Sequence, residues 1–196
     1  CQKLKSVEFT SDSELHTISK YAFNLSSITN FSIPSSVKIL DEHCFSNCKQ
    51  FKKIEIPFNS QLQIIGKYAF FFSAIQSFSV PPQLTKICEN AFYFCSQLQK
   101  FEIPFNSELQ VVETSALNCT SIESFTIPSK LNQIGKFAFS SKCIKIMEIN
   151  ESNEMEYIDK HIFGYIKYIM LPAELSGHFN MIFPYLERNF SFIIFK

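Results

Sequence analysis

The chain repeats one phrase of its own sequence. Residues 56–70 read IPFNSQLQIIGKYAF, and residues 103–117 read IPFNSELQVVETSAL, which is the same phrase 47 residues later. A period in this range is typical of repeat architectures, in which each unit buries its apolar face only by stacking against its neighbours. The repeat therefore constrains the fold more than any other feature of the chain.

Each 47-residue unit divides into a shorter and a longer coil. We call the mostly aromatic residue that closes each phrase the anchor, and successive anchors are 22, 25, 22, 25, 22 and 24 residues apart. The positions eight and five residues before every anchor are apolar, and the position just before it is usually small, which suits a site wedged under the neighbouring coil. The anchors are Phe23, Phe45, Phe70, Phe92, Leu117, Phe139 and Phe163.

An alternating triplet followed by proline recurs downstream of the anchors. Alternation with period two places the first and third residues inward and the middle one outward, and proline ends the ladder because it has no N–H to donate. We therefore expect one parallel sheet, with the Phe anchors stacked inside the coils. The predicted strands are residues 31–33, 54–56, 78–80, 101–103 and 125–127.

The pattern L..I...AF..C..L..I.IP, carried by LTKICENAFYFCSQLQKFEIP at 84–104 and VKILDEHCFSNCKQFKKIEIP at 37–57, resembles the BspA-like leucine-rich repeats of surface proteins. The resemblance implies a curved, right-handed leucine-rich-repeat solenoid, with a parallel β-sheet on the concave face and short strands or helical turns on the convex side. It departs from the pattern at Leu117, in place of the anchor Phe, and at Asn150, in place of the proline.

The resemblance also sets the expected domain organisation. It covers residues 1–172 as about seven coils of 22–25 residues, the first truncated, so that a longer parent chain is expected. Residues 173–196 fit only as a degenerate terminal repeat or cap, with Phe183 as an eighth anchor and a last strand at 190–194.

Composition restricts the possible partners. Lys plus Arg and Asp plus Glu each number 18, so no global field draws the chain to nucleic acid or to an acidic membrane. No apolar run approaches the ~18 residues of a membrane span. With only four Gly but 23 Phe, we expect turns that do not depend on glycine and a core lined with Phe.

The outward positions of the predicted strands form two regular columns. One alternates acid with hydroxyl, the other alternates Lys with Ser or Asn, and both become apolar toward the C-terminal end. The alternation either keeps like charges off neighbouring strands, which favours solubility, or forms a polar surface for a protein or glycan. The candidate partner-binding residues are Lys53, Glu55, Ser79, Lys100, Glu102, Thr126, Glu148, Tyr168 and Met170.

The cysteines predict buried thiols rather than a metal site. Cys1, Cys48 and Cys95 share one phase, two strands apart, and at roughly 10 Å they lie beyond the ~7 Å limit of a disulfide. Cys119 could pair with Cys95 or Cys143 in an oxidising compartment. No second Cys or His pair stands at zinc spacing, and we expect no metal and no cofactor.

Catalytic motifs are absent from the sequence. The four His are scattered, and there is no glycine-rich phosphate loop, H-E-x-x-H or G-x-S-x-G, so we expect no enzyme. Among the N-x-[ST] sequons, Asn24 and Asn118 directly follow an anchor, in a turn where a glycan could be attached.

The family resemblance implies a function class. It favours a non-enzymatic recognition or adhesion module at the cell surface, which binds a protein, such as a host or extracellular-matrix protein, or a glycan through the concave face. The alternative is an intracellular scaffold that uses the same solenoid for protein–protein interaction. The repeats alone do not separate the two.

Overall fold

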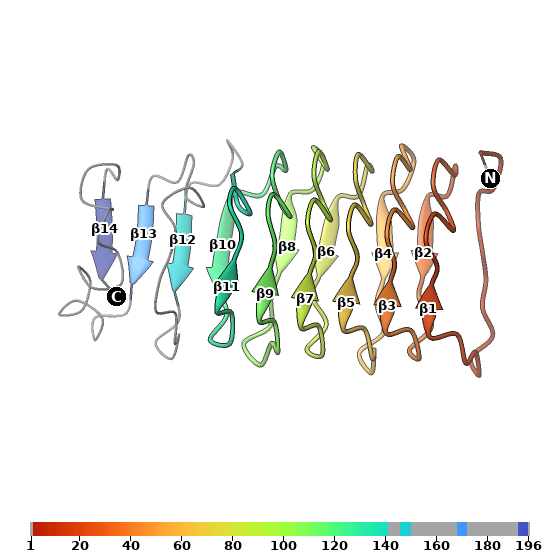
Figure 1. Cartoon of the computed structure of the whole chain (residues 1–196), viewed down its shortest axis with the longest axis horizontal. Coiled ribbons are helices and arrows are strands. Elements are labelled where there is room, and N and C mark those ends of the chain that lie inside the picture. The colour runs from red at the N-terminus through yellow and green to blue at the C-terminus, as the bar shows by residue number, and fades with distance from the viewer. Residues whose placement is uncertain (1, 141–145, 150–167, 172–191, 196) are drawn as a thin grey trace.

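The computed structural model describes residues 2–140, 146–149, 168–171 and 192–195. Within this part the chain forms a row of coils stacked side by side, and no helix is present there (Figure 1). Each complete coil runs up one wall, turns at the upper edge, runs down the other wall and turns back at the lower edge (Figure 1). The apolar side chains lie between the two walls.

The first wall carries the strands that precede proline. Its four-stranded parallel sheet has the order β2-β4-β6-β8, and β10 begins a further parallel sheet of the order β10-β12-β13-β14. The bounds are β2 Asn30–Ser32, β4 Lys53–Glu55, β6 Ser77–Ser79, β8 Lys100–Glu102, β10 Ser124–Ile127, β12 Ile146–Ile149, β13 Tyr168–Leu171 and β14 Phe192–Phe195.

The predicted parallel ladder is confirmed, although its strands begin one residue earlier than predicted. The donors continue past the strand ends, because Ile33 N donates to Glu55 O at 3.1 Å and Val80 N to Glu102 O at 2.8 Å. The one-residue difference between predicted and observed bounds therefore depends only on where each strand is assigned to end.

The second wall is a six-stranded parallel sheet of two-residue strands, in the order β1-β3-β5-β7-β9-β11. These are the short strands that the family resemblance implied as one alternative for the side opposite the main sheet. Their bounds are β1 Thr17–Ile18, β3 Ile39–Leu40, β5 Ile64–Ile65, β7 Lys86–Ile87, β9 Val111–Val112 and β11 Gln133–Ile134.

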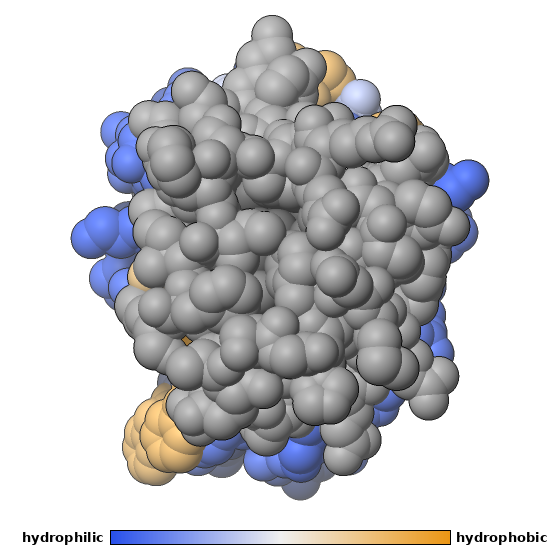
Figure 2. Space-filling view, turned by 90° about the vertical axis from the view of Figure 1, so that its left-hand side faces the viewer, coloured by the Kyte–Doolittle hydropathy of each residue, from blue (hydrophilic) through white to orange (hydrophobic). Residues whose placement is uncertain are grey.

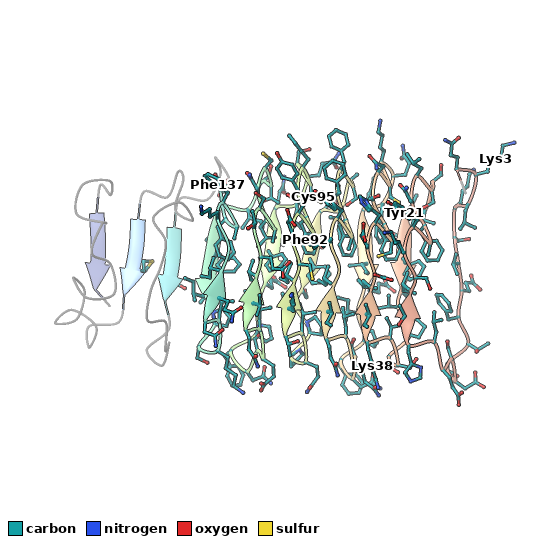
Figure 3. The ribbon with its side chains drawn as sticks, viewed as in Figure 1. Lys3, Tyr21, Lys38, Phe92, Cys95 and Phe137 are labelled. Atoms are coloured by element: carbon teal, nitrogen blue, oxygen red, sulfur yellow. The ribbon has the colours of Figure 1, made fainter. Side chains whose placement is uncertain are left out.

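Stacked phenylalanine rings fill the core. The anchors Phe45, Phe70 and Phe92 are fully buried, and their ring centroids are 5.5 Å and 4.8 Å apart in turn. Phe92 lies within the stack of coils (Figure 3). Leu117 is equally buried in the place of a Phe. Phe23 was expected inside but is only half-buried, although its ring packs against the core and stacks on Phe45 with centroids 5.3 Å apart.

The turns around the anchors use left-handed backbone without glycine. In every complete turn the residues two before and two after the anchor have positive φ, for example 55° at Tyr68 and 56° at Phe72. The N–H groups of Tyr68, Phe70 and Phe72 donate to the next coil, whereas those of Ala69 and Phe71 donate back within their own turn. The N–H groups of successive residues must therefore point in opposite directions, and the left-handed backbone conformation makes this possible.

Two glycines serve close packing rather than turning. A Cβ added at Gly66 would stand 2.8 Å from Leu40 O, and one at Gly135 would stand 2.2 Å from Thr114 N, both in the preceding coil. Neither glycine has a positive φ.

The ring stack predicts a contrast between two phenylalanines. Phe92→Ala should lower the free energy of unfolding by about 3–5 kcal/mol, because it opens a cavity in the ring stack. Phe105→Ala should change it by less than about 0.5 kcal/mol, because that ring is 90% exposed. Chemical denaturation of both variants measures the difference, and equal losses would contradict the ring stack.

The turn geometry predicts a stabilising substitution. Ser115→Gly should raise the free energy of unfolding by up to about 1 kcal/mol, because Ser115 has a φ of 54° that costs a non-glycine residue free energy. Thr114→Gly, next to it and without a positive φ, should instead lower stability by about 0.5–1 kcal/mol. Thermal unfolding of the pair tests the sign.

Candidate binding face

The outward side chains of β2, β4, β6, β8 and β10 form what we call the long-strand face. The family resemblance predicts that this face is the concave one. On β4, Lys53 Nζ lies 2.9 Å from Glu55 Oε1, and the two side chains are 61% and 53% exposed. An ion pair this exposed contributes little to stability. Folding therefore does not account for these charges.

Hydroxyl groups hold the carboxylates of the neighbouring strand. Ser32 Oγ donates to Glu55 Oε2 at 2.5 Å, and Ser79 Oγ donates to Glu102 Oε2 at 3.0 Å. The hydrogen bond from Ser32, aided by Lys53, lowers the pKa of the Glu55 carboxyl. The alternation of acid with hydroxyl thus does more than separate like charges, because each hydroxyl orients the acid of the next strand.

The face continues onto the later strands. Thr126 Oγ1 donates to Glu148 Oε2 at 3.3 Å, and β12 pairs with β13 so that Ile146 is in register with Tyr168 and Glu148 with Met170. Register thus brings the predicted residues together along two columns, with the apolar positions at the C-terminal end. Their role in binding stays a prediction.

Lys100 differs from Lys53. It is exposed on β8, and no ion pair within the described part of the chain joins it to an acidic side chain, although Glu102 stands two residues away on the same face. The β8 positions therefore present a positive charge that is not neutralised as it is on β4.

A second set of charges lies in the turns at the upper edge, and its pairing was not predicted from the sequence. These charged residues stand three positions before an anchor. Lys20 pairs with Glu42 at 2.8 Å and Lys67 with Glu89 at 3.1 Å, and each pair joins two adjacent coils. The signal in the sequence is the alternation of Lys with Glu at this phase. These pairs join neighbouring coils, and because their side chains are also largely exposed they contribute little to stability.

The upper edge also borders an open groove of about 980 Å³ over β9 and β11. Glu113 lies in it, bonded to Lys86 Nζ at 2.6 Å and to the backbone N of Glu89 at 2.9 Å. Partial burial raises the pKa of the Glu113 carboxyl, but these bonds outweigh it and hold the pKa below its usual value. The carboxylate is thus fully engaged as an acceptor rather than poised to take a proton.

The thiols behave as buried core groups, as predicted for Cys48 and Cys95. Their Sγ atoms donate to the backbone oxygens of Phe23 at 3.0 Å and Phe70 at 2.9 Å in the preceding coil. Burial raises the pKa of Cys48, and that of Cys95 to about 12, so neither is a reactive thiolate. Cys95 and Cys119 are both free, so the disulfide considered between them is not formed. Cys1 and Cys143 lie outside the described residues.

Neither a metal site nor a membrane span is found in the described ranges. No group of three or more His, Cys, Asp or Glu there could hold a metal ion, and no helix there is long and apolar enough to cross a membrane.

The two predicted glycosylation positions lie in anchor turns, as expected from their phase. Asn24 and Asn118 are half-buried, and Asn24 Oδ1 accepts a hydrogen bond from Ser46 Oγ at 3.1 Å. Their modification stays a prediction.

Comparison with known proteins identifies the repeat. The profile of the BspA type leucine rich repeat region matches in six copies, over residues 1–61 and 55–170. No curated protein shows significant sequence similarity to the chain.

Solved structures share the fold at low sequence identity. The crystal structure of the pneumococcal vaccine antigen PcpA matches with a TM-score of 0.69 and 20% identity, over 80% of this chain and 50% of that one. A leucine-rich repeat protein from Bacteroides ovatus matches with a TM-score of 0.51 and 20% identity, over 87% of this chain and 56% of that one. The chain thus spans about half the length of these solved relatives. The repeat profile covers nearly the whole of residues 1–170, and the chain therefore belongs to the BspA-type leucine-rich repeat family.

Proposed function

We propose that the chain is a non-enzymatic recognition module that binds a protein partner at a cell surface through the long-strand face. The observation that carries the proposal is the regular column of exposed charges and hydroxyls on a rigid parallel sheet. Because neighbouring strands already orient the carboxylates, a partner meets charges whose side-chain entropy is partly lost before binding.

The chemistry of the face favours a partner with charges of both signs. Glu55 and Glu102 offer fixed acceptors to Lys or Arg of a partner, and Lys100 offers a donor to an acid. Complementary charges of this kind govern specificity and association rate more than affinity. A glycan is the other ligand class that the hydroxyls and carboxylates suit, since sugar hydroxyls both donate and accept hydrogen bonds.

Location at the surface is supported by the family and by the likeness to a pneumococcal vaccine antigen. The second candidate function, an intracellular scaffold, is favoured by one observation: the five cysteines of the described ranges are all free, as is usual in a reducing compartment. Antibody staining of intact and of permeabilised cells that express the protein separates the two. Staining that appears only after permeabilisation would support the scaffold.

Charge reversal tests the face. The quadruple variant K53E/E55K/K100E/E102K keeps the net charge and should leave the free energy of unfolding within about 1 kcal/mol, since exposed pairs contribute little. Its affinity for immobilised extracellular-matrix protein or intact host cells should fall by about tenfold, because every charge contact changes sign. Surface plasmon resonance and cell-binding assays measure the change.

The upper edge supplies a matched control. The variant K20E/E42K/K67E/E89K reverses two cross-coil ion pairs, keeps both pairs intact and preserves the net charge. It should bind as the parent does. If both quadruple variants bind as the parent does, the charges of the long-strand face serve solubility, and the site moves to the apolar positions Ile146, Tyr168 and Met170.

A further inference from the structure

We propose that the lower edge of the stack is a second interaction surface, which binds an extended proline-rich segment in the polyproline II conformation. By lower edge we mean the loops of residues 57–61, 81–83 and 104–108, with Phe58 and Phe105 as the two contact side chains. This surface is separate from the long-strand face and does not depend on the function proposed for it.

Phe58 and Phe105 are exposed to a degree that folding does not explain. Their side chains are 97% and 90% exposed, and they occupy the same position in the two IPFNS loops. Burying a Phe stabilises a fold by about 1.5–3 kcal/mol, and neither ring contributes this. The loop does not need Phe for its shape, because Ser11 stands at the corresponding position of the loop before β1.

Hydrophobic residues project at the lower edge in the end-on view of the molecule (Figure 2). Isolated apolar residues on a surface are ordinary, but two nearly fully exposed rings at equivalent positions form a regular feature. The recurrence of this exposed ring at one position of the repeat is the observation on which the proposal rests.

Hydrogen bonds fix the backbone of the two loops that carry these rings. In the first loop Ser60 N donates to Pro57 O at 3.0 Å, which closes a turn that includes residue Phe58. Leu62 N donates to Ser60 Oγ at 3.2 Å. Gln61 N is bonded to Ser35 O of the preceding coil at 2.9 Å.

The second loop repeats this arrangement. Ser107 N donates to Pro104 O at 3.0 Å, Leu109 N to Ser107 Oγ at 3.2 Å, and Glu108 N to Pro82 O at 2.9 Å. Both turns are therefore organised before a ligand arrives, which lowers the entropic cost of binding.

The spacing of the two loops selects the ligand conformation. Phe58 and Phe105 are two coils apart, which corresponds to about 9.5 Å at the usual distance between strands. A polyproline II helix advances about 9.3 Å in its three-residue turn, so every third side chain faces the same way at nearly this spacing. A β-strand repeats its face after about 6.7 Å and does not match.

The surroundings of the rings suit an uncharged extended chain. Pro82 lies on the coil between the two rings, and the exposed side chains next to them include Asn59, Asn106 and Gln83. A polyproline II segment has no internal hydrogen bonds, so its carbonyl groups can accept from these amides. Aromatic side chains with nearby donors are the usual setting for such ligands.

One charged pair near Phe105 is neutralised internally. Glu108 accepts from Lys130 Nζ at 2.6 Å and 2.7 Å, so this pair presents no free cation to an anionic lipid headgroup. Lys38 also projects at this edge, so the test below includes an anionic membrane as an outcome (Figure 3).

The test uses a synthetic peptide of four Leu-Pro-Pro triplets, labelled with a fluorophore, and the folded chain. We expect saturable binding in fluorescence anisotropy and chemical-shift changes confined to the lower-edge loops. The variant F58S/F105S should weaken the affinity by about tenfold, because it removes both aromatic contacts. It should fold as the parent does, since Ser already stands at this position in the first loop.

Three controls make the result specific. F72S/F94S removes two half-exposed rings of the upper edge and should leave binding unchanged. A peptide of four Leu-Gly-Ser triplets keeps the Leu spacing in sequence but lacks the polyproline II preference, and it should bind about tenfold more weakly. K53E/E55K/K100E/E102K should bind the proline-rich peptide normally, so failure of the long-strand face and failure of the lower edge can be told apart.

The proposal is overturned if F58S/F105S binds the peptide as the parent does, or if both peptides bind equally. Binding of phosphatidylserine vesicles that is lost in F58S/F105S, without peptide binding, would assign the edge to a membrane instead. A dimer in analytical ultracentrifugation that the same substitutions dissociate, again without peptide binding, would assign it to a second copy of the chain.

Discussion

Backbone hydrogen bonds between successive anchor turns set the register of the whole stack. Each turn sends every second N–H to the next coil, and the positive φ values at residues such as His43 and Asn47 make this alternation possible. The outward side chains at the same phase then stack, so that His43 lies between Tyr21 and Tyr68 with ring centroids 4.8 Å away on each side. The cost of the left-handed conformation, about 1–2 kcal/mol for each non-glycine residue, is offset within the ladder itself. Once the turns are aligned, both walls and the Phe rings between them must align as well.

The alternation of shorter and longer coils explains where the exposed chemistry lies. The extra residue before β4 is absorbed as a bulge, because Lys52 N and Lys53 N both donate to Thr29 O, at 2.8 Å and 3.4 Å. Strand register survives, so Ser32 of a shorter coil meets Glu55 of a longer one. The other two extra residues form the loop that carries Phe58. One difference in coil length thus places the charged positions and the exposed rings on the same coils.

Much of the fold could be predicted from the sequence because its determinants are periodic. The inward positions, the proline stops and the Phe anchors recur with the coil, and Phe45, Phe70 and Phe92 lie where the period puts them. The two-residue strands of the second wall were not assigned, since a strand such as Ile39–Leu40 buries only one residue and leaves no alternation to read. Phe23 was misplaced because the period assigns every anchor the same burial, whereas its ring is only half-buried.

The candidate site was predicted less completely, because its contacts join different coils. The alternation of acid and hydroxyl is visible in the sequence, but the bond from Ser79 to Glu102 depends on strand register. The exposure of Phe58 and Phe105 was equally hidden, since hydrophobic residues in a Phe-rich chain read as core.

The two proposed surfaces lie close together on one coil, which has a consequence for recognition. Lys100 and Glu102 project from β8, and Phe105 projects from the loop that follows it. A partner with a folded, charged surface and a proline-rich tail could engage both, and the second contact would then form within the complex at a high effective concentration. Weak binding at each surface would suffice for such a partner, whereas a protein that matched only one surface would dissociate quickly. Because every second coil repeats both surfaces, a longer solenoid of this kind would strengthen the discrimination without any new type of contact.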